Sequence, residues 1–137
     1  MTLGDFVQKY IKTKVDFDGA YGAQCVDLFR QYCKDVYNLP HTGAVNGAKD
    51  LVENYDRLPK ERKYFALIKD KFSAMTGDVA VFGKTKANPY GHVAIVLAAT
   101  GSDLFVFEQD GIRQDGAKLN RRPTENVIGY LRRYPEI

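Results

Sequence analysis

The chain has 137 residues, of which 45% are hydrophobic and 27% are charged. These proportions fit one folded domain with a core of ordinary size and exclude a chain that is disordered by composition. The net charge of +3 is too weakly basic for a typical nucleic-acid-binding protein, and no apolar stretch is long enough for a transmembrane helix. We therefore expect one monomeric domain over residues 1–137, with neither a nucleic acid nor a membrane as partner.

The first half of the chain has helical periodicity. Apolar residues recur every three or four positions in residues 3–11 and again in residues 25–37. Between these segments, residues 14–24 are rich in Asp and Gly and are predicted to form a loop. A shorter pattern in residues 48–55 predicts a third helix of two turns. The charged segment 60–72 is interpreted as a loop with one helical turn.

The periodicity changes in the second half of the chain. Alternating and continuous apolar runs predict four strands, over residues 79–82, 91–99, 104–108 and 127–134. Helices that precede strands, with short connections between them, are typical of α+β domains. The sequence therefore predicts an α+β fold in which N-terminal helices pack on an antiparallel β-sheet.

Two cysteines, Cys25 and Cys33, fall in the predicted helix over residues 25–37. Eight residues of helix place their Cα atoms about 12 Å apart, which is too far for a disulfide. Cys33 belongs to the apolar stripe and is assigned to the core. Cys25 lies at the start of the helix, where the helix dipole favours a thiolate and the Cys25 amide can bind an oxyanion. From position alone, a small buried residue is an equally good interpretation of Cys25.

Of the two histidines, His92 opens the most apolar of the predicted strands, and His41 follows Pro40 in a polar loop. We interpret His41 as a structural residue. A histidine at the start of a strand can face a cleft, and pairing with the next strand would let Glu108 or Asp110 reach its imidazole. A thiol, an imidazole and a group that orients the imidazole form the arrangement of nucleophilic catalysis.

Four short segments resemble motifs of the CHAP family, the cysteine- and histidine-dependent amidohydrolases/peptidases, and occur in the family's order. They are residues 21–28 around the cysteine, 77–82, 91–96 around the histidine, and 107–110. The resemblance implies a papain-like fold and a single CHAP-like catalytic domain. It also implies cleavage of an amide bond of bacterial peptidoglycan by a phage lysin, acting as an endopeptidase or an N-acetylmuramoyl-L-alanine amidase.

The same resemblance implies roles for individual residues. Cys25 would be the nucleophile, His92 the general base, and Glu108 the residue that orients His92. Many family members have Asn at the position of Asp110, and an Asp there can accept a hydrogen bond from the imidazole but cannot donate an amide N–H. We assign three further residues to the cleft and the oxyanion site, namely Tyr21, Gln24 and Tyr90.

The loop before Cys25 carries carboxylates at positions one, three and twelve, from Asp16, Asp18 and Asp27. This spacing resembles an EF-hand loop but lacks its glycine at position six, and an Asp-rich helix cap is the alternative interpretation. Some phage CHAP domains are similar here and hold calcium in the equivalent loop. That resemblance implies Ca2+ as a cofactor, with the backbone carbonyls of Ala20 and Gly22 completing the ligand shell.

Two other functions stay open, a calcium-dependent cell-wall-binding module without catalysis and a papain-like protein peptidase or deamidase. The N-terminus lacks the basic region of a secretory signal peptide. This agrees with the resemblance to phage lysins, which implies a phage-encoded enzyme, made in the host cytoplasm, that acts on the wall after release or from the virion. The pairs Arg121–Arg122 and Arg132–Arg133 are interpreted as solvated surface residues.

Overall fold

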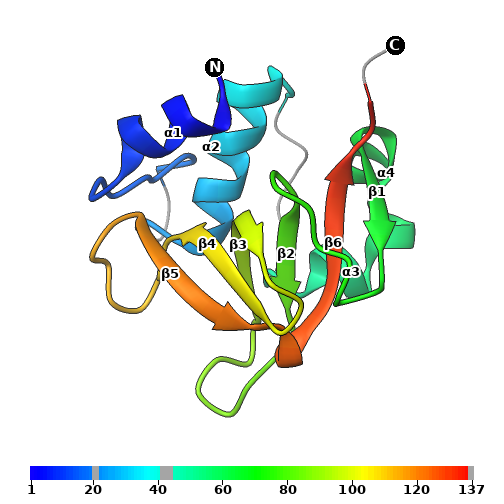
Figure 1. Cartoon of the computed structure of the whole chain (residues 1–137). Coiled ribbons are helices and arrows are strands. Elements are labelled where there is room, and N and C mark those ends of the chain that lie inside the picture. The colour runs from blue at the N-terminus through cyan, green and yellow to red at the C-terminus, as the bar shows by residue number, and fades with distance from the viewer. Residues whose placement is uncertain (20–21, 41–44, 136–137) are drawn as a thin grey trace.

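The computed structural model describes residues 1–19, 22–40 and 45–135 (Figure 1). Its helices are α1 (Leu3–Tyr10), α2 (Cys25–Tyr37), α3 (Asp50–Glu53) and α4 (Pro59–Tyr64), with 3-10 turns η1 (Tyr55–Arg57) and η2 (Thr124–Asn126). Helices α1 and α2 lie together over one end of the sheet, whereas α3 packs beside β6 and α4 packs beside β1. None of the helices formed by the described residues has the length and apolarity needed to cross a bilayer.

Six strands form one antiparallel sheet in the order β1-β6-β2-β3-β4-β5. Their bounds are β1 (Phe65–Ile68), β2 (Val79–Phe82), β3 (His92–Ala99), β4 (Asp103–Glu108), β5 (Lys118–Pro123) and β6 (Val127–Arg133). The predicted α+β class and the antiparallel sheet are confirmed. Because β3 runs antiparallel to β2 and β4, its first residue lies beside the ends of both neighbours, and Phe82 is directly opposite His92.

Two strands of the sheet were not predicted from the sequence. The segment 60–72, interpreted as a loop with a helical turn, contains α4 and then β1. Strand β5, with the sequence KLNRRP, has few apolar residues and was not recognised as a strand. Both are edge strands of the sheet, where polar side chains are common because one side of the strand faces solvent.

The side chains of β2 alternate between two buried clusters on opposite faces of the sheet. Val79 and Val81 belong to the larger cluster, and Ala80 and Phe82 belong to the smaller one. Helices α1 and α2 cover the larger cluster, which includes Cys33 at 4% exposure. The assignment of Cys33 to the core is therefore confirmed. Packing of α2 against β3 fixes the start of the helix relative to the start of the strand.

Arg132 was interpreted as a solvated residue, and the structure shows that this is wrong. Its Nε and Nη2 donate to the two carboxylate oxygens of Asp78, each at 2.9 Å. Asp78 is buried and also accepts a hydrogen bond from the backbone N–H of Met75. This ion pair ties the turn before β2 to β6.

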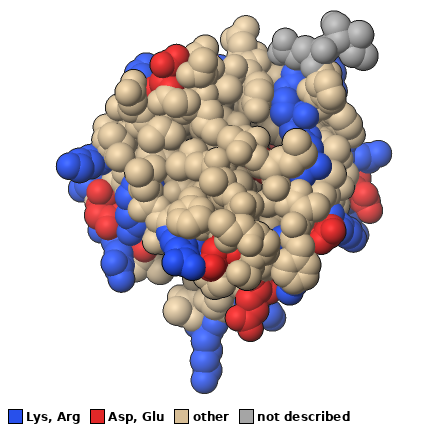
Figure 2. All heavy atoms as spheres, viewed as in Figure 1, with Lys and Arg blue, Asp and Glu red and all other residues tan. Residues whose placement is uncertain are grey.

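The charged side chains of the described residues are interspersed around the edge of the face shown in Figure 2, and its centre is formed by uncharged residues. Positive and negative groups are mixed on this face, and a few of them reach inward from the edge. The small net positive charge is therefore not gathered in the middle of this face.

Candidate active site

Cys25 is the first residue of α2, and its side chain is partly exposed. Gln24 caps the helix with an extended backbone, and its N–H donates to Oδ2 of Asp27 at 2.9 Å. The first N–H groups of a helix have no intrahelical acceptors, so the positive end of the dipole lies at Cys25. This position stabilises negative charge on the sulfur or on an oxygen bound next to it.

His92 begins β3 and Glu108 ends β4, and the two side chains meet. Nε2 of His92 lies 3.2 Å from Oε1 of Glu108, which leaves Nδ1 as the ring nitrogen available to Cys25. Burial by itself would lower the pKa of His92. Hydrogen bonding to Cys25 and Glu108, together with their charges, outweighs burial and raises the pKa to about 9. His92 therefore keeps a proton at neutral pH.

The carboxylate of Glu108 is fully buried and accepts hydrogen bonds from three side chains. His92 and Nε of Arg122 contact Oε1, while Nη2 of Arg122 and Nδ2 of Asn120 contact Oε2 at 2.7 Å and 3.1 Å. Burial would raise the pKa of Glu108, but these hydrogen bonds hold it well below its usual range. Glu108 is therefore a carboxylate at every pH at which the protein is expected to work.

Asn120 and Arg122 are site residues that sequence reasoning missed. Arg121 is exposed and pairs with Asp103 at 2.7 Å, as its interpretation as a solvated residue predicts. Arg122 is turned the opposite way, because successive side chains of a strand alternate between its faces. The interpretation of Arg122 as solvated is therefore wrong. The polar residues at every second position of β5 were the available signal.

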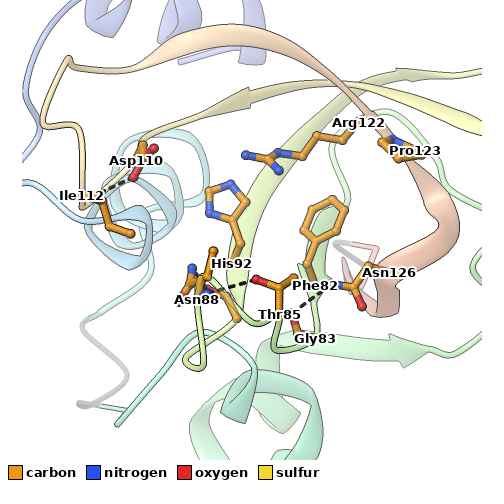
Figure 3. Close-up of a pocket in the computed structure, with 12 residues that line it drawn as sticks. Phe82, Gly83, Thr85, Asn88, His92, Asp110, Ile112, Arg122, Pro123 and Asn126 are labelled. Atoms are coloured by element: carbon orange, nitrogen blue, oxygen red, sulfur yellow. Dashed lines mark hydrogen bonds between the residues drawn. The ribbon is translucent and has the colours of Figure 1, made fainter.

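A pocket of about 320 Å3 adjoins His92 (Figure 3). His92 and Arg122 point toward each other on one wall of the pocket, and Phe82 lies beside them. The other walls of the pocket come from the loop over residues 83–91, from the turn after β4 and from the β5–β6 connection. The lining of the pocket is a mixture of polar and apolar groups, so it can offer a ligand both hydrogen bonds and apolar contacts.

Asp110 lines the same pocket, but its carboxylate is used by the turn after β4. Oδ1 of Asp110 accepts hydrogen bonds from the backbone N–H groups of Ile112 at 2.8 Å and Arg113 at 3.4 Å. Within residues 1–19, 22–40 and 45–135, the structure shows no hydrogen bond between Asp110 and His92. The role of Asp110 in orienting the imidazole stays a prediction, and its observed contacts stabilise the turn.

Two of the three residues assigned to the cleft and oxyanion site are described by the structure. Gln24 is next to Cys25 as the helix cap, while Tyr90 is 63% exposed and its carbonyl accepts from the backbone N–H of Lys49 at 3.1 Å. Tyr21 lies outside the described residues, as do Ala20 of the predicted calcium loop and the second histidine, His41.

Two glutamine side chains, which sequence reasoning did not assign, hold the loop before Cys25. Oε1 of Gln109 accepts from the N–H of Val15 at 2.7 Å, and its Nε2 donates to the carbonyls of Val15 and Gln24 at 2.7 Å and 2.8 Å. Gln114 bonds both backbone groups of Ala23 in the same way, at 3.0 Å and 2.9 Å. These contacts fix the two ends of the loop to the segment after β4.

Replacing Gln109 with alanine is expected to lower the free energy of unfolding by about 2–4 kcal/mol, because buried backbone groups lose their partners. Urea denaturation measures this effect. A matched control is Gln8→Ala, since Gln8 is exposed on α1, and it should cost less than about 0.5 kcal/mol. Equal stability of the two variants would contradict a role for Gln109 as a tether.

The three carboxylates of the loop converge in space. Ligand oxygens of Asp16, Asp18 and Asp27 all lie within 4.8 Å of one another. Asp27 is buried, and its pKa is raised to about 6, first by burial and then by repulsion from Asp18 and Asp16. A hard cation would relieve both effects, and three carboxylates are a donor set that suits one. The residues present therefore fit a calcium ion. The predicted role of the Gly22 carbonyl stays a prediction.

In a comparison with known protein families, the model of the CHAP domain matches residues 14–110. Endolysin PlyTW of Staphylococcus phage Twort is 35% identical over an alignment of 97 residues, which covers 65% of this chain and 19% of that protein. The D-alanyl-L-alanine endopeptidase of Streptococcus phage B30 is 37% identical over an alignment of 90 residues, which covers 63% of this chain and 19% of that protein. The chain thus matches about a fifth of each of these curated relatives.

Two solved structures share the fold. The wild-type endolysin LysIME-EF1 superposes with a TM-score of 0.72 and 24% identity, over 96% of this chain and 64% of that one. The structure of Ly7917 superposes with a TM-score of 0.67 and 20% identity, over 97% of this chain and 63% of that one. The predicted papain-like α+β fold is confirmed by these neighbours.

Proposed function

Because the chain belongs to the CHAP domain family, we propose that it hydrolyses an amide bond of bacterial peptidoglycan by a cysteine-dependent mechanism. The observation that carries the proposal is the line of contacts from Cys25 at the start of α2, through His92, to the buried Glu108. The names of the two phage relatives, an endolysin and an endopeptidase, support the choice of a cell-wall substrate.

The geometry supports a reaction in two stages. The thiolate of Cys25 attacks the carbonyl carbon, and the amide N–H groups at the start of α2 stabilise the oxyanion that forms. His92 gives its proton to the leaving amine, and a thioester to Cys25 remains. His92 then takes a proton from a water molecule, whose oxygen attacks the thioester and releases a carboxylic acid, and the Cys25 thiolate and the His92 imidazolium are restored. Glu108 stabilises the imidazolium in both stages.

Digestion of purified cell walls tests this function. The protein should lower the turbidity of a wall suspension, and mass spectrometry of the released fragments should show a new amino terminus at the cleaved amide. The residue at that terminus distinguishes an endopeptidase from an N-acetylmuramoyl-L-alanine amidase. The name of the phage B30 relative favours the endopeptidase.

The same experiment separates the two other candidate functions. A protein peptidase or deamidase would process casein and leave the walls unchanged. A wall-binding module without catalysis would sediment with the walls and release no fragments. Either result would reject peptidoglycan hydrolysis.

We propose that calcium binds the loop carboxylates and orders the approach to Cys25. Asp27 belongs to the first turn of α2 and accepts from the backbone N–H of Gln24, so an ion held by Asp27 acts directly on the residues around the nucleophile. The ion would neutralise the mutual repulsion of Asp16, Asp18 and Asp27. The calcium ion would fix the position of the residues around Cys25 and change the local charge. The scissile carbonyl does not need to contact the ion.

Chelation with EGTA is expected to lower the melting temperature and the rate of wall lysis together, and added calcium should restore both. A ligand of the native state stabilises by about 2.7 kcal/mol at a hundredfold excess over its dissociation constant. Calorimetric titration and thermal unfolding measure this effect. The double variant Asp16→Ala/Asp18→Ala should behave like the chelated protein and should not respond to calcium.

The control removes two exposed acids elsewhere, as Asp56→Ala/Glu125→Ala, and changes the net charge by the same amount. This control should keep the calcium response of the wild type. If the wild type releases no heat with calcium and loses no activity in EGTA, the loop is an Asp-rich helix cap.

A further inference from the structure

The ion pair between Arg122 and Glu108 takes no part in the proposed two-stage hydrolysis of the amide bond. The guanidinium donates from Nε to one carboxylate oxygen and from Nη2 to the other, the latter at 2.7 Å. The first of these oxygens, Oε1, is also the one that contacts His92. Two parallel hydrogen bonds from a planar guanidinium fix the plane of a carboxylate as well as its charge.

Arg122 is itself held on a second side. Its guanidinium carbon lies 5.6 Å from the ring centre of Phe82, and that ring is 5.8 Å from the imidazole of His92. Figure 3 shows these three side chains gathered on the same wall of the pocket. A cation over an aromatic face is attracted to it, so the direction of the Arg122 side chain is set before any substrate binds.

We propose that Arg122 is a positioning residue, which locks the Glu108 carboxylate in the orientation that aims the His92 imidazole at Cys25. The inference rests on the proposed function and deepens it, because Arg122 acts through Glu108 on the same site. Asn120 holds only one oxygen of Glu108 and leaves the carboxylate free to pivot. Small misplacements of a reacting group lower reaction rates strongly.

The charge of Arg122 also acts on the site. Among the described residues, the titratable or charged groups that face His92 are Cys25 of α2, Glu108 of β4, Asp110 of the turn after β4 and Arg122 of β5, whereas β2 presents the ring of Phe82. Protonated His92 and Arg122 thus share one carboxylate. Without the guanidinium, the whole charge of Glu108 acts on the imidazolium, which then holds its proton more strongly.

The test compares Arg122→Met and Arg122→Lys with the neighbouring control Arg121→Met. Arg121 has its own carboxylate partner, Asp103, but at the surface. We expect Arg122→Met to lower the maximal rate of wall cleavage about 10- to 100-fold, the effect seen when the outer hydrogen-bond partners of metal-bound residues are removed. Arg122→Lys keeps the charge without the paired hydrogen bonds and should recover only part of the rate. Arg121→Met should stay within about twofold of the wild type.

Two further measurements exclude a merely structural effect. In a Glu108→Gln background, Arg122→Met should lower the rate little further, because both changes interrupt the same contact. The chain has two histidines, so NMR of labelled histidine can follow the titration of His92 directly. The His92 titration should move to higher pH in Arg122→Met and stay at the wild-type position in Arg121→Met.

The titration needs no substrate, so it separates this inference from the proposed function. If the wild-type protein does not cleave walls but the titration of His92 shifts in Arg122→Met, the proposed function is rejected and the contact between Arg122 and Glu108 is supported. A folded Arg122→Met with wild-type rate and titration would overturn the inference, as would rate effects that simply add in the double variant. If Arg122→Met does not fold, a fully active Arg122→Lys would overturn it and a slowed one would support it.

Discussion

Replacing Cys25 with alanine is expected to abolish wall lysis, with a loss of about 10⁴-fold or more, because an alanine side chain cannot form the thioester intermediate. The loss of one partly exposed sulfur should change the melting temperature by only a few degrees. Turbidity assays on purified walls and thermal unfolding measure the two quantities. The pKa of His92 should also fall in this variant, since hydrogen bonding to Cys25 is one of the interactions that raise it.

The second cysteine supplies the matched control. Cys33 is buried in the core, and burial raises the pKa of its thiol to about 12, so it stays protonated and unreactive. Cys33→Ala should keep most of the activity and lower the free energy of unfolding by about 1–3 kcal/mol through lost packing. A folded but inactive Cys33→Ala, together with an active Cys25→Ala, would reverse the assignment of the nucleophile.

Replacing His92 with alanine is expected to lower the rate about 10²- to 10⁴-fold, because the leaving amine loses its proton donor. The other histidine, His41, is the control and should be dispensable. Glu108→Gln should be milder than His92→Ala, since the amide keeps an acceptor oxygen but loses the charge that favours imidazolium. Asp110→Asn keeps the oxygen that caps the turn and should be tolerated.

The pH dependence follows from the raised pKa of His92. The imidazolium persists up to about pH 9, so cleavage should decline only as the pH passes that value. The stabilisation that comes with the raised pKa is complete below the ordinary histidine pKa of about 6.5 and is lost as the pH rises through the folded value. Glu108→Gln should move the alkaline limb to lower pH. An alkaline limb near pH 6.5 in the wild type would reject the pairing of His92 with Glu108.

Several local features were predictable because they depend on nearby residues. The apolar period of residues 25–37 gave the bounds of α2, and the run of residues 79–82 gave those of β2. The change from a glycine-rich loop to a helix placed Cys25 at a helix start, which the structure shows. The chemistry of each functional group could therefore be inferred from its place in one element.

The order of the edge strands and the contacts of β5 could not be predicted from the pattern of neighbouring residues in the sequence. A strand with the sequence KLNRRP lacks the apolar alternation that marks a buried strand, and its polar side chains suit solvent equally well. Only the pairing of β5 with β4 shows that Asn120 and Arg122 face Glu108 while Arg121 does not. The same holds for Gln109, whose partners at Val15 and Gln24 are remote in sequence.

The sequence by itself determined the α+β class, the start of the nucleophile helix, the histidine strand and the acid-rich loop, because helix and strand periods and helix capping are local properties of the chain. The tertiary structure alone decided that Arg122 forms a two-point ion pair with Glu108 and that Asp110 accepts hydrogen bonds within the turn after β4. It also decided that two glutamines anchor the loop before Cys25. These contacts join segments that no local pattern connects. They form only when burial between the helices and the sheet brings distant polar groups together and removes the water that would otherwise satisfy them.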